Sequence, residues 1–292
     1  MTPPADGTIT TIEFRGRDRN RIVATSVGDP SDPPVVLCHG GGQTRHSWHT
    51  TTADLGRSGW HAVSIDLRGH GDSEWAADGD YSLEAFRDDV ITVARSLGRP
   101  VLIGASLGGT SSLAALGHTA DDPCGRALVL VDVAPHVEAA GTERIRAFMT
   151  ERMHDGFADL AEVADAVHAY NPHRPRPADL DGLRKNVRQR DDGRWYWHWD
   201  PAFITRRPSD EDEPRARLIK PAVLDDAARS LTVPTLLVRG RQSDLLSEHG
   251  AREFIALVPH ARFADVGGAG HMVAGDRNDA FNDTVIDFLR SI

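Results

Sequence analysis

The fold is decided by one stretch of the chain, which reads Val101-Leu102-Ile103-Gly104-Ala105-Ser106-Leu107-Gly108-Gly109. Its β-favouring start and the alanine- and leucine-rich run that follows to about Leu116 predict a strand, a sharp turn and a helix. Gly104 and Gly108 let the backbone pass close to itself, which holds Ser106 in strained dihedral angles. The serine hydroxyl would then lie exposed beside the positive end of a helix. An ordinary strand-to-helix turn would look similar, so the rest of the chain must supply the partners of a nucleophile.

The overall composition is typical of a globular protein with a sizeable core. The chain has 292 residues, of which 40% are hydrophobic and 26% are charged. It carries 33 basic and 43 acidic residues, a formal net charge of −10, without a dense basic stretch. We therefore expect no nucleic-acid partner. No signal-peptide pattern or membrane-length apolar run is present, so we expect no membrane partner. The presence of only two cysteines fits a reducing cytoplasm. The oligomeric state cannot be read from the sequence, and a monomer or a homodimer is expected.

Cysteine and histidine patterns give no sign of a metal or another cofactor. Cys38 and Cys124 are too few for a disulfide framework and do not form a metal motif. No set of histidine, aspartate and cysteine residues has the spacing of metal ligands, and serine chemistry needs no metal. The sequence therefore predicts a cofactor-free protein.

Short apolar stretches of the kind that form buried strands alternate with helical patterns. An opening hairpin is predicted at Thr8–Phe14 and Arg21–Val27, and the buried strands are Val35–Cys38, Ala62–Ile65, Ala127–Val131 and Val233–Val238. Helices are predicted at 48–58, Ser82–Leu97 and Glu248–Leu257, and the chain closes with a strand at Arg262–Val266 and a helix at Asp276–Arg290. This alternation predicts an α/β fold with a mostly parallel sheet, in which ligands bind at the carboxyl ends of the strands.

The alternation breaks down between residues 134 and 230. Helix-like stretches at Thr142–Met153 and Leu160–Ala169 are followed by the aromatic run Trp195-Tyr196-Trp197-His198-Trp199. We interpret this segment as a mainly helical lid, inserted after the sixth strand and lying over the strand ends. The predicted domains are thus a core of residues 1–133 and 231–292 and a lid of residues 134–230.

The chain also supplies a base and a carboxylate, the two partners that a nucleophilic serine needs. His271 lies in the glycine-rich loop Gly267–Met272, and Asp244 follows the strand that ends at Val238. The order serine, aspartate, histidine, each at a strand end, is the order of an α/β-hydrolase triad. Asp132 also ends a strand near the serine and is a rival for the carboxylate. We favour Asp244.

These landmarks together resemble the α/β-hydrolase-fold serine hydrolases that carry an inserted lid. His39-Gly40-Gly41-Gly42 is similar to the family's oxyanion loop, and Asp66-Leu67-Arg68-Gly69-His70-Gly71-Asp72-Ser73 to the loop after its fourth strand. The resemblance implies an oxyanion hole made by the backbone N–H of Leu107 with that of Gly41 or Gly42. Relatives that cleave epoxides or carbon–halogen bonds use an aspartate at the position of Ser106, which argues against those reactions here.

Several other residues are candidates for smaller roles. Trp48, His198 and Trp197 are the candidates for substrate binding, although core packing would also explain the tryptophans. His39 is expected to form local hydrogen bonds that shape the glycine loop. Asp66 and Arg68 are expected to form a structural ion pair.

The sequence therefore predicts a hydrolase that cleaves a small carboxylic ester or lactone through an acyl-enzyme. Cleavage of an amide or of a C–C bond beside a ketone, and perhydrolysis, would use the same residues and remain alternatives. A small-molecule receptor that retains the fold but barely catalyses is a further alternative, from a different class of protein.

Overall fold

A single eight-stranded sheet organises the protein. The computed structural model describes residues 9–172, 175–176, 179–205, 221–273 and 278–292. The strands lie in the order β1-β2-β4-β3-β5-β6-β9-β10. Their bounds are β1 Thr10–Arg15, β2 Arg21–Val27, β3 Pro34–Cys38, β4 His61–Ile65, β5 Val101–Ala105, β6 Ala127–Val131, β9 Thr235–Gly240 and β10 Arg262–Val266. Within this sheet, the described pairs β1/β2 and β2/β4 are antiparallel, and the other neighbours are parallel. The predicted mostly parallel α/β-hydrolase sheet is confirmed.

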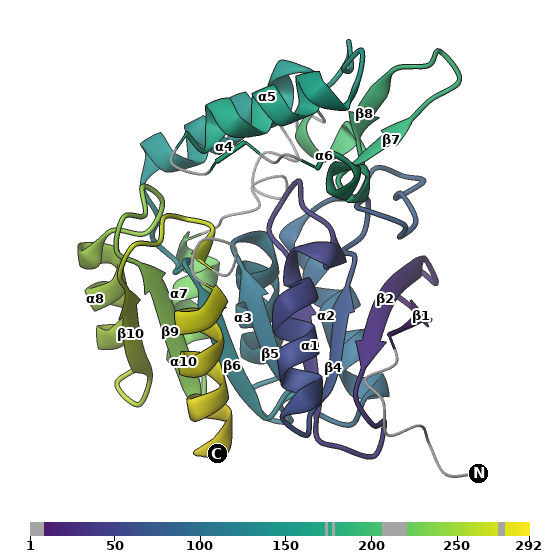
Figure 1. Cartoon of the computed structure of the whole chain (residues 1–292). Helices are drawn as coiled ribbons and strands as arrows, with labels where there is room; N and C mark the ends of the chain where they lie inside the picture. The colour runs from purple at the N-terminus through teal and green to yellow at the C-terminus, as the bar shows by residue number, and fades with distance from the viewer. Residues whose placement is uncertain (1–8, 173–174, 177–178, 206–220, 274–277) are drawn as a thin grey trace.

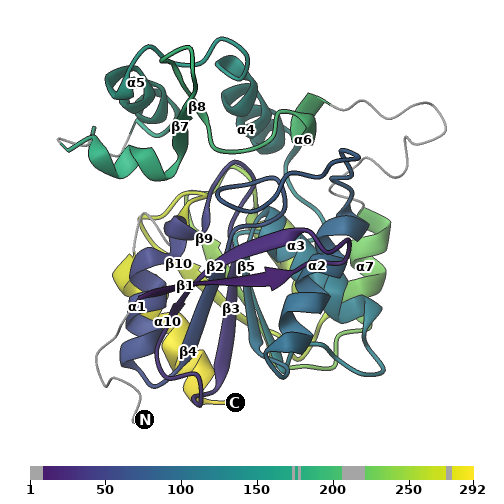
Figure 2. The same cartoon turned by 90° about the vertical axis from the view of Figure 1, so that its right-hand side faces the viewer.

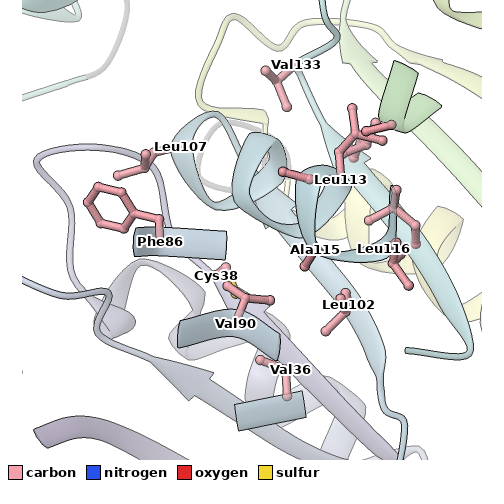
Figure 3. Close-up of a cluster of buried hydrophobic side chains, with 14 of the residues drawn as sticks. Val36, Cys38, Phe86, Val90, Leu102, Leu107, Leu113, Ala115, Leu116 and Val133 are labelled. Atoms are coloured by element: carbon pink, nitrogen blue, oxygen red, sulfur yellow. The ribbon is translucent and has the colours of Figure 1, made fainter. Parts of the chain in front are cut away.

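Helices cover both faces of the sheet, as Figure 2 shows. One face carries α1 (His49–Arg57) and α10 (Asn278–Arg290), and the other carries α2 (Leu83–Ser96), α3 (Leu107–His118), α7 (Pro221–Arg229) and α8 (Glu248–Leu257). Side chains alternate along each strand, so Val36 and Leu102 face α2 and α3 while Leu37 and Ile103 face α1 and α10. Figure 3 shows the α2 and α3 side, where Phe86 and Val90 pack with residues of β3 and β5. Burial on both faces explains the continuous apolar strands.

Two buried ion pairs fix the loop that follows β4. Arg68 is 2% exposed, and its guanidinium donates to both oxygens of Asp89 on α2, at 2.7 and 3.0 Å. Asp66 is fully buried and pairs instead with Arg45, which belongs to the short helix η1 (Arg45–Trp48). The predicted Asp66–Arg68 pair is therefore wrong, because each residue has a partner from a neighbouring segment. Both pairs still have the expected structural role.

The segment after β6 lies above the carboxyl ends of the strands, as Figures 1 and 2 show. It consists of α4 (Ala139–Glu151), α5 (Leu160–Tyr170), η2 (Asp181–Lys185), β7 (Val187–Gln189), β8 (Trp195–Trp197) and α6 (Ala202–Thr205). We call residues 134–205 the inserted segment. It has its own apolar cluster, which includes Met153, Phe157 and Trp195. It is tied to the core where Tyr81 donates to Asp200 at 2.6 Å.

The predicted limits of the elements are close to the observed ones, with one difference in organisation. Helix α7 falls inside the predicted 134–230 insertion, yet its buried residues Leu224, Ala227 and Ala228 belong to the core cluster beside α3. The predicted first residues of the opening strand, Thr8, and of the closing helix, Asp276, lie outside the described residues. Within the described ranges, no helix is long and apolar enough to cross a bilayer.

Candidate active site

Ser106 lies in the sharp turn between β5 and α3. Its φ of 45° and ψ of −113° are strained for a residue with a side chain. A Cβ at Gly104 would lie 2.4 Å from the carbonyl oxygen of Gly108, and one at Gly108 would lie 2.3 Å from that of Cys38. Both glycines are therefore required by close backbone contacts, as the sequence indicated. The turn leaves Ser106 at the wall of a cavity.

That cavity lies between the sheet and the inserted segment and has a volume of about 410 Å³. The core contributes the glycine loop, Ser106 and His271, and α4, α5, η2 and β8 of the inserted segment contribute most of the apolar lining. The apolar side chains of the inserted segment that line it are Ile145, Phe148, Met149, Val167, Leu183, Trp197 and Trp199. A small molecule in this cavity would be largely surrounded by apolar surface.

His271 is oriented by Asp132. Its Nδ1 lies 2.7 Å from Oδ2 of Asp132, which is fully buried at the end of β6. The same carboxylate accepts from the N–H of Gly240 at 2.9 Å and from the hydroxyl of Ser243 at 2.5 Å. Because a carboxylate accepts, Nδ1 carries the proton, which leaves Nε2 of His271 free to act as a base.

Among the described interactions, Asp244 forms no hydrogen bond or ion pair with His271, so the prediction that favoured it over Asp132 is wrong. Its carboxylate accepts from the Arg144 guanidinium of α4 at 2.6 Å, and its side chain is 43% exposed. The preceding residue, Ser243, is the one that reaches the site, where it hydrogen-bonds Asp132. The two aspartates follow the neighbouring strands β6 and β9, so their positions in the sequence were equally suitable.

Two backbone N–H groups beside the serine are available to bind an oxyanion. The N–H of Leu107, the first residue of α3, and that of Gly41 have no acceptor in the described parts of the chain. The N–H of Gly42 donates to Nε2 of His70 at 3.1 Å, and that of Gly40 donates to the Gln43 side chain. Of the two glycines predicted as alternatives, the structure therefore favours Gly41 over Gly42.

Two buried neutral histidines hold the loops around the site. His39 donates from Nδ1 to the carbonyl of Gly40 at 2.7 Å, and its Nε2 accepts from the N–H of Leu67. This is the local role expected for His39. His70, which sequence reasoning did not single out, donates from Nδ1 to the carbonyl of Arg68 and accepts from Gly42. Burial lowers the pKa of His39 to about 4 and that of His70 to about 3.

The three predicted substrate-binding residues separate into two groups. Trp48 and Trp197 line the cavity, together with Trp199, which was not predicted. His198 does not line it, because alternate residues of this extended run face opposite sides. His198 lies instead in a neighbouring groove near Asp72.

Comparison with known proteins identifies the class to which this fold and site belong. A family model for the alpha/beta hydrolase fold matches residues 33–277, and the chain belongs to that family. An esterase of Mycobacterium tuberculosis is 32% identical over 263 residues, covering 87% of this chain and 82% of the esterase. A 3-hydroxybutyrate-oligomer hydrolase of Cupriavidus necator is 29% identical and covers 86% and 87% of the two chains.

Solved structures agree with this assignment. The crystal structure of the M. tuberculosis esterase has a TM-score of 0.75 and 29% identity, covering 97% of this chain and 92% of that one. The structure of an E-2-(acetamidomethylene)succinate hydrolase has a TM-score of 0.83 at 22% identity, covering 97% and 100%, and supports the fold. The predicted enzyme class, a carboxylic ester hydrolase, is confirmed by the family and the named relatives.

Proposed function

We propose that this protein hydrolyses a small-molecule carboxylic ester or lactone through an acyl-enzyme formed on Ser106. One observation carries the proposal. The buried Asp132 holds His271 at 2.7 Å, and His271 shares a cavity with the strained Ser106. A serine, an oriented histidine and a buried carboxylate are the groups required to generate and stabilise a serine nucleophile at neutral pH.

The proposed reaction has two halves. Nε2 of His271 accepts the hydroxyl proton as Ser106 attacks the ester carbonyl, and the N–H groups of Leu107 and Gly41 bind the resulting oxyanion. His271 then protonates the leaving alkoxide, and the tetrahedral intermediate collapses to the acyl-enzyme. In the second half His271 removes a proton from water, which attacks the acyl carbonyl. The tetrahedral intermediate then collapses, and His271 returns the proton to the Ser106 oxygen, which releases the acid and the free serine. Asp132 stabilises the imidazolium in both halves.

The size and lining of the cavity support a small substrate with a large apolar part. The cavity of about 410 Å³ is covered by the inserted segment, which would exclude a folded polymer. The named relatives, an esterase and a 3-hydroxybutyrate-oligomer hydrolase, support the choice of an ester as the bond that is cleaved.

Turnover of 4-nitrophenyl butyrate tests the proposal. Ser106→Ala should lower kcat/KM by at least about 10³-fold, because the acyl-enzyme can no longer form. Ser58→Ala changes the same residue type on an exposed part of the core and is the matched control, with unchanged kinetics expected. Equal activity of the wild type and Ser106→Ala would contradict the proposal.

A further inference from the structure

A lysine lines the catalytic cavity. Of the described lining residues, Lys185 is the only one among the aspartate, glutamate, lysine and arginine types. It is the last residue of η2 in the inserted segment, and its side chain is exposed. It forms no ion pair in the described parts of the chain. An unpaired cation beside an apolar lining is a group to which an anionic ligand could bind without displacing an internal partner.

Lys185 also lies where the catalytic cavity meets a second, more polar groove of about 620 Å³. Lys185 and His46 line both spaces. The arginines of the groove already have carboxylate partners. These contacts join Arg45 and Arg188 to Asp72, at 2.8 and 2.7 Å, and Arg184 to Asp181, at 3.2 Å. Among the described residues of this junction, Lys185 is thus the cation that remains free for a ligand.

The composition of the cavity lining also favours a negatively charged ligand. No carboxylate lies among the described lining residues. A bound carboxylate would therefore meet the Lys185 ammonium without facing a like charge from the described wall.

We propose that Lys185 binds a carboxylate at the end of the substrate remote from the reacting ester bond. The preferred substrates would be half-esters of dicarboxylic acids, or lactones that bear a carboxylate. This inference rests on the proposed ester hydrolysis at Ser106. A single carboxylate is favoured over a phosphate dianion because one free ammonium balances one negative charge. The three nearby arginines, Arg45, Arg184 and Arg188, are balanced by the carboxylates of Asp66, Asp72 and Asp181.

Two 4-nitrophenyl esters of equal chain length test the preference. Mono-4-nitrophenyl adipate has a free carboxylate, and methyl 4-nitrophenyl adipate carries a neutral ester in its place. We expect wild-type kcat/KM to be about fivefold higher for the anionic ester, the size expected of a solvent-accessible ion pair, with the difference mainly in KM. The preference should shrink in 1 M NaCl because salt screens such a pair.

Variants of Lys185 separate its charge from its bulk. Lys185→Ala should bring the ratio of the two kcat/KM values close to one, and Lys185→Arg should largely retain the preference. Arg146→Ala removes the same charge from an exposed position on α4 that lines neither space, and should leave the ratio unchanged. A wild-type ratio near one, or an unchanged ratio in Lys185→Ala, would overturn the inference while leaving hydrolysis at Ser106 intact.

A binding measurement tests the carboxylate site without turnover. In the Ser106→Ala protein, titration calorimetry should show monomethyl adipate binding more tightly than neutral dimethyl adipate, and Ser106→Ala/Lys185→Ala should lose the difference. Equal binding of the two compounds, or no saturable binding of monomethyl adipate at 10 mM, would contradict the inference. Loss of all ester turnover in the wild type with this binding pattern retained would instead contradict only the proposed hydrolysis.

Discussion

At the scale of single residues, the chemistry depends on which aspartate faces His271. Asp132 has a φ of 52°, a left-handed conformation that turns the chain sharply at the end of β6. There its carboxylate receives hydrogen bonds from His271, Gly240 and Ser243. Asp244 is turned toward Arg144, a residue 100 positions earlier in the sequence. In the proposed mechanism Asp132 fixes the tautomer of His271, and Asp244 only joins the core to α4.

Substitution of the two aspartates distinguishes these roles. Asp132→Asn should lower kcat by about 10³- to 10⁴-fold, because an amide cannot stabilise the imidazolium and favours the wrong tautomer. Asp244→Asn makes the same chemical change at an exposed position and should alter kcat by about twofold or less. Steady-state kinetics with thermal melts as a folding control would measure both. A larger loss for Asp244→Asn would return the triad acid to the position that the sequence favoured.

At the scale of elements, the loop after β4 and the helix α2 are joined by one buried ion pair. Asp89 on α2 is 2% exposed and accepts both hydrogen bonds from the guanidinium of Arg68. It also accepts from the backbone N–H of Arg17 at 2.9 Å. This single carboxylate therefore connects α2 to the loop whose His70 holds the glycine loop in place.

Removal of that carboxylate should destabilise the fold strongly. We expect Asp89→Ala to lower the free energy of unfolding by about 3–5 kcal/mol, because it leaves the Arg68 guanidinium buried without its main partner. Asp122→Ala is the control, since Asp122 is 84% exposed and lies 3.9 Å from Arg95. That change should stay within about 0.5 kcal/mol. Urea denaturation measures both, and equal effects would show that burial of the Arg68–Asp89 pair matters little.

The sequence predicted the elements well, and its misses have physical causes. Continuous apolar stretches such as Val101–Ile103 are a strong local signal, since both faces of a parallel strand are buried. Which aspartate serves as the proposed triad acid depends instead on backbone turns and on Arg144 from a distant helix. The choice of Gly41 as the proposed oxyanion donor depends on His70, whose ring nitrogen accepts the hydrogen bond of the Gly42 N–H. The role of Lys185 depends on which carboxylates pair with its neighbours, which no local pattern encodes.

At the scale of the whole molecule, the buried histidines make stability depend on pH. His39 and His70 are fully buried and neutral, with pKa values lowered from 6.5 to about 4 and about 3. Between pH 6.5 and these values the unfolded chain binds protons that the folded chain does not. The free energy of unfolding is therefore unaffected by these two histidines above pH 6.5. Below pH 6.5 it decreases, down to about pH 4 for His39 and about pH 3 for His70.

Urea unfolding at several pH values tests this expectation. As the pH falls from 6 to 4.5, each of the two histidines should lower the free energy of unfolding by up to about 1.4 kcal/mol for each unit of pH. His70→Gln removes one titrating group while keeping an acceptor for Gly42, so its slope should be smaller than that of the wild type. An identical slope in the variant would show that His70 does not remain neutral in the folded protein.

The central claim is that Ser106 is the nucleophile, and intact-protein mass spectrometry after treatment with an alkyl fluorophosphonate tests it most directly. We predict that the wild-type protein gains one phosphonyl group, that peptide mapping places it on Ser106, and that Ser106→Ala gains none. A phosphonyl adduct that persists in Ser106→Ala would contradict the claim.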